Sequence, residues 1–277
     1  MTITIQAAKL TNMIEFMQIT VDPAVAARCE ALPGMRVMVD LESIGKAERQ
    51  AGRNTFISDH TLNDVARMRR ILERTPLLVR INPLGAHSCE EIEHVVAHGA
   101  DAIMLPMFRT SDDVERFCEL VDARAHTVAL LETREALRNL DEWVTHPALD
   151  EVYVGLNDLH ISLGMRFMFE PLADGTLDRV AQATHRAGKR FGFGGVACAE
   201  DGYVPGRDIL AEHVRLRSRS VILSRTFNES SRASSFEYEI EKLRAYEKNY
   251  LALTDDELTI EHHRVSAQIW QMVNQIR

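Results

Sequence analysis

Two apolar segments in the middle of the chain each end on a carboxylate. The first runs from His126 to Glu132 and the second from Val152 to Asp158. Short apolar runs of this kind are typical of buried strands, and a charge at the carboxyl end of such a strand needs a reason. Two carboxylates brought to one place repel each other unless they share a proton or a cation. Because a hard divalent metal such as Mg²⁺ takes one or two carboxylates and leaves positions for water and substrate, the pattern predicts that Glu132 and Asp158 bind a metal.

Arg80 lies inside another apolar run, from Leu77 to Ile81. A guanidinium in such a place would be buried at a large cost unless it faced an anion. We expect Arg80 to bind a substrate carboxylate or a developing enolate oxygen through two parallel hydrogen bonds. The alternative is a structural ion pair with Asp40 or Glu42, and an enzyme without substrate could contain that pair as well.

The chain alternates short apolar segments with amphipathic ones, and these elements must position the charged residues. The segments predicted as strands are 14–20, 35–41, 77–81, 102–105, 126–132, 152–158, 189–193 and 220–223. Segments with the three- and four-residue spacing of helices separate them. Eight such strands, with no break in composition, predict an α/β fold in which residues 1–230 form one (β/α)8 TIM barrel.

Residues 231–277 follow the predicted barrel and form a helical extension with two predicted helices, 235–251 and 255–276. Phe236, Ile240 and Leu243 recur at three- and four-residue steps, so one face of the first helix is apolar and must be buried. This face either closes on its own subunit or contacts another subunit of a homo-oligomer, and the sequence leaves both open.

The composition limits the partners of this protein. The 277 residues are 45% hydrophobic and 26% charged, which is typical of a globular protein, and the formal net charge is -9. The negative charge argues against nonspecific binding of nucleic acid or of an anionic membrane. The first residues lack the pattern of a signal peptide, so we expect a cytoplasmic protein with a small-molecule ligand. Four widely spaced cysteines predict buried, reduced thiols.

Five short motifs occur in an order that resembles a known family. They are Val39-Asp40-Leu41-Glu42, Val79-Arg80-Ile81-Asn82, Ile103-Met104-Leu105-Pro106, Leu130-Leu131-Glu132-Thr133 and the run from Gly155-Leu156-Asn157-Asp158 to Gly164. Between about Met35 and Ala197 the chain is similar to the HpcH/HpaI aldolase and citrate lyase β-subunit family. The resemblance implies a barrel enzyme that binds Mg²⁺ or Mn²⁺. It also implies that a carbon–carbon bond is made or broken next to an enolate of pyruvate or of an acyl thioester.

The resemblance implies a role for each matching residue. Glu132 and Asp158 become the metal ligands, and Arg80 becomes the cation that steadies the enolate. The substrate-binding residues implied by the same motifs are Pro106, Gly155 and Asn157. The chemistry agrees, because a chelated metal can take up the charge of an enolate as a Lewis acid, and fixed positive charge on Arg80 adds to this stabilisation.

A general base must also take the proton from the hydroxyl group that becomes the aldehyde. His60 is one candidate, because its pKa lies near neutrality and it follows a polar segment, 43–59, that is long enough to be a functional loop. Glu42 is the other candidate, since the lyase branch of the family has acidic residues after Asp-Leu. The chain departs from the family at Ser43, where an acid is expected, and at Met107, where many relatives have a lysine.

The leading hypothesis is a class II-type aldolase that cleaves or forms a small 2-oxo acid through a metal-stabilised pyruvate enolate. A second hypothesis within the enzymes is a CoA-thioester lyase of the citrate or malyl type. A third, from a different class, is a non-catalytic barrel that acts as a binding or scaffold subunit. Proton exchange at the methyl group of pyruvate distinguishes the three.

Overall fold

The computed structural model describes residues 13–45, 58–232 and 234–276, so residues 46–57 of the predicted functional loop lie outside the described part. Eight strands form a closed barrel in chain order, which confirms the predicted (β/α)8 fold. The strand pairs with a recorded register are parallel. The strands are β1 (Glu15–Ile19), β2 (Met35–Asp40), β3 (Leu77–Arg80), β4 (Ala102–Leu105), β5 (His126–Leu131), β6 (Glu151–Val154), β7 (Arg190–Val196) and β8 (Ser220–Leu223).

Helices alternate with these strands. They are α2 (Pro23–Ala31), α4 (Leu62–Arg69), α5 (Ser88–Ala97), α6 (Ser111–Val121), α7 (Arg134–Arg138), α8 (Leu140–Trp143), α9 (Leu156–Leu163), α10 (Glu170–Ala173), α11 (Thr176–Arg186), α12 (Gly206–Arg215), α13 (Arg225–Ser230), α14 (Phe236–Tyr250) and α15 (Asp255–Gln275). Residues 134–143 form two short helices, because Asn139 leaves the helical backbone region and separates α7 from α8.

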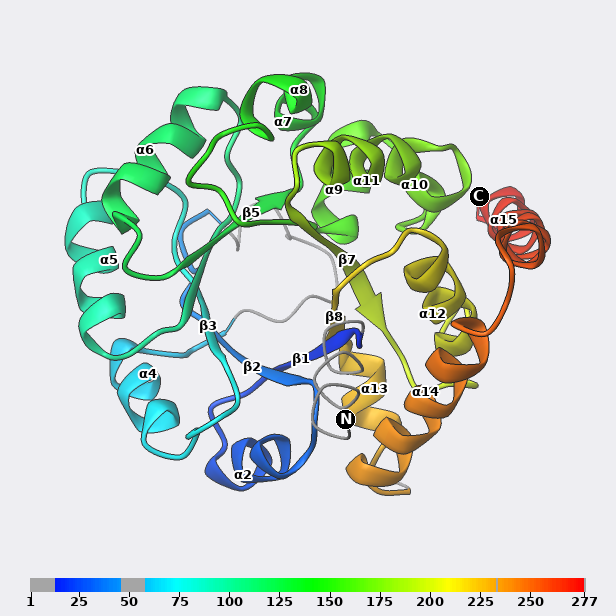
Figure 1. The fold of residues 1–277 in the computed structure, drawn as a ribbon, viewed down its shortest axis with the longest axis horizontal. Coiled ribbons are helices and arrows are strands. Elements are labelled where there is room, and N and C mark those ends of the chain that lie inside the picture. Colours follow the sequence, from blue (N-terminus) through cyan, green and yellow to red (C-terminus); the bar gives the residue numbers. More distant parts are fainter. Residues whose placement is uncertain (1–12, 46–57, 233, 277) are drawn as a thin grey trace, which may run out of the picture. The chain divides into compact units, whose positions relative to one another are not determined.

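The chain divides into two compact units, residues 17–153 and residues 1–16 with 154–277. In the first unit, helices α2, α4, α5 and α6 follow one another around the outside of strands β2 to β5 (Figure 1). The middle of each of these strands is buried on both faces, as is expected for strands covered by helices. Arg36 of β2 is also buried, and its guanidinium donates to Glu151 at 3.0 Å, so neither buried charge lacks a partner.

In the second unit, the C-terminal helices pack on their own chain. Helix α14 lies against α12, and α15 lies against α10 and α12. Arg244 of α14 donates to the carbonyl oxygen of Ile14, and its guanidinium lies 3.8 Å from the centre of the Phe16 ring. The backbone N–H of Ile14 donates to Glu247 at 2.7 Å. The extension therefore binds the segment that enters β1, while a further contact between subunits stays a prediction.

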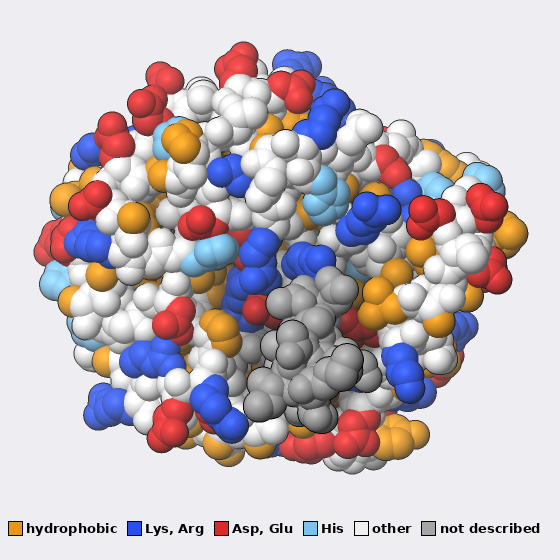
Figure 2. Space-filling model, in the orientation of Figure 1, with side chains coloured by type: hydrophobic (Ala, Val, Ile, Leu, Met, Phe, Trp, Pro, Cys, Tyr) orange, Lys and Arg blue, Asp and Glu red, His pale blue; other side chains and the backbone are white. Residues whose placement is uncertain are grey.

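Charged side chains of both signs are interspersed over the face of the molecule in Figure 2, and hydrophobic side chains are scattered among them. Among the described residues, no helix combines the length and the apolar character needed to cross a bilayer. Three of the four cysteines are buried as predicted, but Cys89 is exposed. It lies outside the buried face of α5 that contains Ile92 and Val95, so the prediction for this thiol was wrong.

His213 is a fully buried imidazole on α12. Its ring stacks on Phe193 with a centroid distance of 3.7 Å and an angle of 3°, and Nδ1 lies 2.8 Å from the hydroxyl of Ser218. Burial disfavours the charged ring and lowers the pKa of His213 from 6.5 to about 3. The folded protein therefore contains a neutral imidazole at neutral pH.

The buried imidazole makes the stability of the fold depend on pH. Below pH 6.5 the unfolded chain binds a proton at His213 that the folded chain does not bind until about pH 3. The free energy of unfolding should therefore fall as the pH is lowered through this range, by roughly 1 kcal/mol between about pH 7 and about pH 5.5. Urea unfolding of the wild type and of His213→Phe, which retains a ring against Phe193, measures this contribution.

The variant should lose this part of the pH dependence. The exposed His94 provides a matched control, since His94→Phe removes a histidine from the surface of α5 instead of from the core. An identical dependence on pH in the wild type and in His213→Phe would contradict the assignment.

Candidate active site

A buried ion pair joins β2 and β3 at their carboxyl ends. Asp40 is the last residue of β2, Arg80 is the last residue of β3, and the parallel register places them opposite each other. Nε and Nη2 of Arg80 donate to the two oxygens of Asp40 at 2.8 and 2.7 Å. The side chains are only 14% and 4% exposed. The structural ion pair weighed from the sequence is therefore present, with the bidentate geometry that arginine favours.

Two further carboxylates lie near this guanidinium. Glu42 is 2% exposed, and one of its oxygens is 3.4 Å from Nη1 of Arg80. Burial lowers the pKa of Arg80, but the charges of Asp40, Glu42 and Glu132 raise it by more, so the group stays protonated. Three carboxylates around one guanidinium leave an excess of negative charge at the carboxyl ends of these strands. Such an environment attracts a cation.

Glu132 directly follows β5 and is 3% exposed. Its Oε1 accepts a hydrogen bond from the backbone N–H of Met107 at 3.0 Å. Met107 has a φ of 57°, a left-handed conformation that is uncommon for residues other than glycine. The lysine expected here is absent, yet the backbone of Met107 still holds Glu132. No sequence pattern reports this contact, because any residue with an N–H can make it.

The turn after β4 is also attached to the end of β5 through Thr133. The hydroxyl of Thr133 donates to the carbonyl oxygen of Phe108 at 2.8 Å and accepts the N–H of Ala136 in α7 at 3.1 Å. Pro106, a predicted substrate-binding residue, is buried at the end of β4. Arg109, two residues after the position of the missing lysine, is exposed.

Asn82 supports the chain that follows Glu42. Its side-chain oxygen accepts the backbone N–H groups of Ser43 and Ile44 at 2.9 and 3.1 Å. Glu91 of α5 accepts the backbone N–H of Asn82 at 3.2 Å and its side-chain N–H at 2.8 Å. The acid expected at position 43 is absent, but the backbone there is held by these bonds. Sequence analysis missed this role of Asn82, although it stands two residues after Arg80.

His60 lies beside the end of β2. Its Nδ1 accepts the backbone N–H of Asp40 at 3.0 Å, so it contacts the backbone of the residue whose side chain holds Arg80. The next residue, Thr61, donates through its N–H and hydroxyl to Asp64 at 2.7 and 2.8 Å. Burial raises the pKa of Asp64, but these bonds and nearby positive charge lower it by a larger amount. The net pKa is below the usual value, so the carboxylate stays ionised.

Asp158 does not end a strand as the sequence analysis predicted. Strand β6 ends at Val154, and Gly155 is the N-cap of helix α9. The predicted strand over 152–158 was therefore wrong in its second half, because the helix begins directly after the glycine. Asp158 is half-buried in the first turn of α9, where a negative charge is favourable.

The N-terminus of α9 contains the predicted substrate-binding residues Gly155 and Asn157, both of them half-buried. The N–H of Leu159 donates to the carbonyl oxygen of Gly155 at 3.0 Å. The N–H groups before it have no acceptor within the helix and point out of its N-terminus. A carboxylate or phosphate group suits such a place.

Glu132 belongs to the first unit of the chain and Asp158 to the second, and their pairing on one metal stays a prediction. Within the described residues, no three side chains of His, Cys, Asp or Glu are grouped closely enough to hold a metal. The oxygen donors of Glu132 and Asp158 are nevertheless of the kind that Mg²⁺ and Mn²⁺ prefer, and these ions keep several waters.

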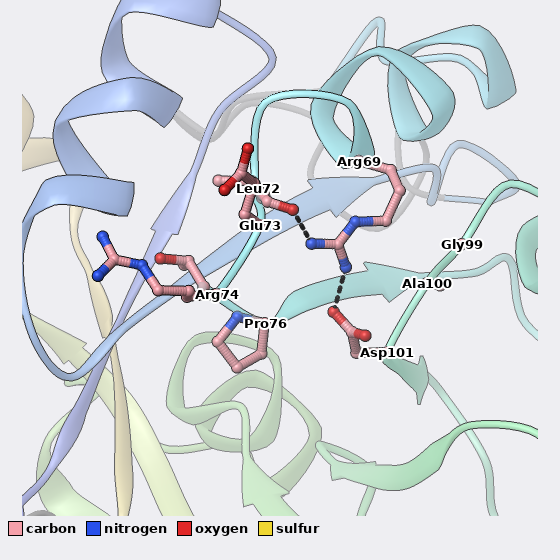
Figure 3. Close-up of a pocket in the computed structure, with 9 residues that line it drawn as sticks. Arg69, Leu72, Glu73, Arg74, Pro76, Gly99, Ala100 and Asp101 are labelled. Atoms are coloured by element: carbon pink, nitrogen blue, oxygen red, sulfur yellow. Dashed lines mark hydrogen bonds and ion pairs between the residues drawn. The ribbon is translucent and has the colours of Figure 1, made fainter.

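A hollow of about 600 Å³ lies near the other ends of β3 and β4. Pro76 precedes β3 and Asp101 precedes β4, whereas barrel enzymes bind substrate at the carboxyl ends of the strands. Figure 3 shows Arg69 reaching Asp101 and the carbonyl oxygen of Leu72. The hollow lies at the end of the strands opposite to the one where barrel enzymes bind substrate, and its arginine already has partners. It is therefore not a candidate for the active site.

The buried pair of Arg80 and Asp40 should contribute strongly to stability. In Asp40→Asn the guanidinium would lose its bidentate charged partner and retain only the longer contact with Glu42, and we expect the free energy of unfolding to fall by about 3 kcal/mol. Urea unfolding near neutral pH measures this change. Glu119→Gln is a matched control, because it breaks an exposed pair with Arg116 and should cost less than about 1 kcal/mol. Equal effects of the two substitutions would show that burial of the pair has no energetic importance.

Comparisons with known proteins agree with this architecture. The family model described as HpcH/HpaI aldolase/citrate lyase matches residues 20–189. A hydroxypyruvate/pyruvate aldolase from Rhizorhabdus wittichii is 35% identical over 83 residues, which cover 27% of this chain. The matched part spans only 30% of that relative.

Two solved structures share the fold. An HpcH/HpaI aldolase/citrate lyase family protein from Burkholderia cenocepacia has a TM-score of 0.61 and 15% identity, with 84% of this chain and 95% of that chain covered. The protein CitE from Mycobacterium tuberculosis, in complex with magnesium, acetoacetate and coenzyme A, has a TM-score of 0.58 and 16% identity, with coverages of 92% and 87%. The family model matches more than half of the chain and confirms the resemblance seen in the five motifs. The chain therefore belongs to the HpcH/HpaI aldolase/citrate lyase family, a family of carbon–carbon lyases.

Proposed function

We propose that this protein is a divalent-metal-dependent carbon–carbon lyase that cleaves or forms a small 2-oxo acid through the enolate of pyruvate. The observation that carries the proposal is the buried guanidinium of Arg80, which lies at the carboxyl end of β3 with Asp40 and Glu42 beside it. Ligands of barrel enzymes bind at this end of the strands. The family and its aldolase relative support the class of reaction.

Glu132 and Asp158 are the proposed ligands of Mg²⁺ or Mn²⁺. Each lies after the carboxyl end of a strand, β5 for Glu132 and β6 for Asp158. The excess of carboxylates around Arg80 favours a cation, and the M. tuberculosis relative was solved with magnesium. When bound, the metal supplies a Lewis acid for the oxygens of the substrate. The N–H of Met107 would fix one oxygen of Glu132 and leave the carboxylate oriented for the ion.

Arg80 would stabilise the negative charge that develops on the enolate oxygen. The carboxylate of Asp40 accepts hydrogen bonds from Nε and Nη2 of Arg80. The planar guanidinium is therefore held in one orientation before substrate binds. A donor that is already oriented costs no reorganisation during the reaction, and such donors contribute about 3 kcal/mol in other enzymes. The bond to Asp40 thus prepares Arg80 for catalysis.

The remaining roles in the proposal concern the substrate and its proton. The N-terminus of α9, with Gly155 and Asn157, would bind the substrate carboxylate, and Pro106 would form part of the wall of the site. Glu42 and His60 are the two candidates for the general base. We further expect a cytoplasmic homo-oligomer.

A CoA-thioester lyase is the second candidate function, because the M. tuberculosis relative was solved with coenzyme A and acetoacetate. The absence of a lysine at Met107 argues for the smaller substrate, since an anionic cofactor needs local positive charge. A non-catalytic scaffold is the remaining possibility, and the same assay tests all three.

Exchange of the methyl protons of pyruvate tests the proposal directly. In D₂O with Mg²⁺ or Mn²⁺, the wild type should exchange these protons, as followed by proton NMR, because the enolate forms without an aldehyde partner. Addition of EDTA should abolish the exchange. A CoA lyase would exchange protons of the thioester only, and a scaffold would exchange neither.

Removal of either proposed ligand should weaken metal binding. In Glu132→Gln and Asp158→Asn the ion loses a charged oxygen donor, and we expect the Kd for Mn²⁺ to rise by at least about tenfold. Titration calorimetry with Mn²⁺ alone measures the constant. Glu90→Gln, at an exposed helical carboxylate, is the control and should bind as the wild type does. Wild-type affinity in both folded variants would remove the metal site from the proposal.

A further inference from the structure

The backbone of β2 and of the residue after it forms hydrogen bonds with a different neighbouring segment on each side. On one side, the carbonyl oxygen of Met38 accepts the N–H of Thr20 at 3.1 Å. On the other, the N–H of Leu41 donates to the carbonyl oxygen of Arg80 at 2.8 Å. Because alternate residues of a strand face the same neighbour, the N–H of Asp40 points to the side where Thr20 lies.

The first strand does not continue far enough to accept that N–H. Strand β1 ends at Ile19, and Asp22 already caps α2, where its carboxylate accepts the N–H of Ala24 at 2.8 Å. A buried N–H at this point needs another acceptor. His60 provides it, with its Nδ1 at 3.0 Å from the backbone nitrogen of Asp40.

His60 is itself held from both sides along the chain. Its own N–H donates to the hydroxyl of Ser58 at 3.2 Å. On the other side, Thr61 and Asp64 fix the start of α4 with two hydrogen bonds. The imidazole therefore lies just before the N-terminus of α4, where it can accept the N–H of Asp40 that β1 does not reach.

The hydrogen bond to Asp40 decides which nitrogen of His60 bears the proton. An imidazole nitrogen that accepts a hydrogen bond has its lone pair engaged, and the neutral ring then carries its proton on the other nitrogen, Nε2. Neither nitrogen of this neutral tautomer offers a lone pair to a substrate. The geometry is thus unsuited to a general base.

We infer that His60 is a positioning residue, which completes the hydrogen bonding of β2 and thereby fixes Asp40, whose carboxylate orients Arg80. Asp40 transmits this effect to two groups, because one of its oxygens also accepts the N–H of Glu42 at 3.2 Å. Glu42 is then the candidate base that remains. The inference deepens the proposed function and rests on it for the role of Arg80.

Two substitutions of His60 separate a positioning role from that of a base. In His60→Asn the side-chain oxygen stands on the same Cγ as Nδ1 and can accept the N–H of Asp40, whereas His60→Ala leaves that N–H without an acceptor. We expect kcat for pyruvate proton exchange to fall on the order of tenfold in His60→Ala and to stay within about threefold of the wild type in His60→Asn. KM should change little in either, since Arg80 acts on the enolate. Equal and large losses in both variants would overturn the inference.

A double-mutant cycle tests the route through Asp40. If His60 acts through that carboxylate, His60→Ala should reduce kcat much less in an Asp40→Asn background than in the wild type. Additive losses would contradict the route. The exposed His94 supplies the control, because His94→Ala should leave kcat unchanged in both backgrounds.

The tautomer can be measured without any activity. In protein labelled with ¹⁵N-histidine, the ring nitrogens of His60 should show a protonated Nε2 and an unprotonated Nδ1 at neutral pH. A protonated Nδ1 would overturn the inference, whereas a wild type that fails to exchange pyruvate protons would overturn only the proposed function.

Discussion

The bidentate bond between Arg80 and Asp40 is the interaction on which the candidate site depends. A guanidinium that is 14% exposed cannot be left without an anion, and the register of β2 and β3 provides one on the adjacent strand. Asp40 in turn is held by its own backbone N–H, which His60 accepts. The site therefore contains a short series of hydrogen bonds. His60 binds the backbone of Asp40, and the carboxylate of Asp40 binds Arg80.

Charge balance connects this ion pair with the proposed metal. Glu42 and Glu132 add two negative charges around a guanidinium that Asp40 already neutralises. Buried carboxylates in such numbers either take up protons or bind a cation. A divalent ion would compensate this excess of negative charge. The same ion would supply the Lewis acid that the proposed reaction needs.

The sequence predicted the barrel because strand and helix periodicities alternate along the whole chain, and it predicted Arg80 because a charge inside an apolar strand is conspicuous. It could not predict that α9 begins at Leu156, because the short apolar run from Val152 to Leu156 is compatible with either a strand or a helix. The contact of His60 with Asp40 was also invisible, because a histidine 20 residues away gives no pattern.

The two departures from the family illustrate a more general limit of side-chain patterns. The backbone N–H of Met107 holds Glu132, and the backbone N–H of Ser43 is held by Asn82. Each contact depends on the path of the chain and would persist with another side chain at that position. Loss of the expected lysine and acid therefore removes two charges without removing the bonds that position the site. Because the absent lysine and the absent acid carry charges of opposite sign, the two replacements together leave the net charge of the site unchanged.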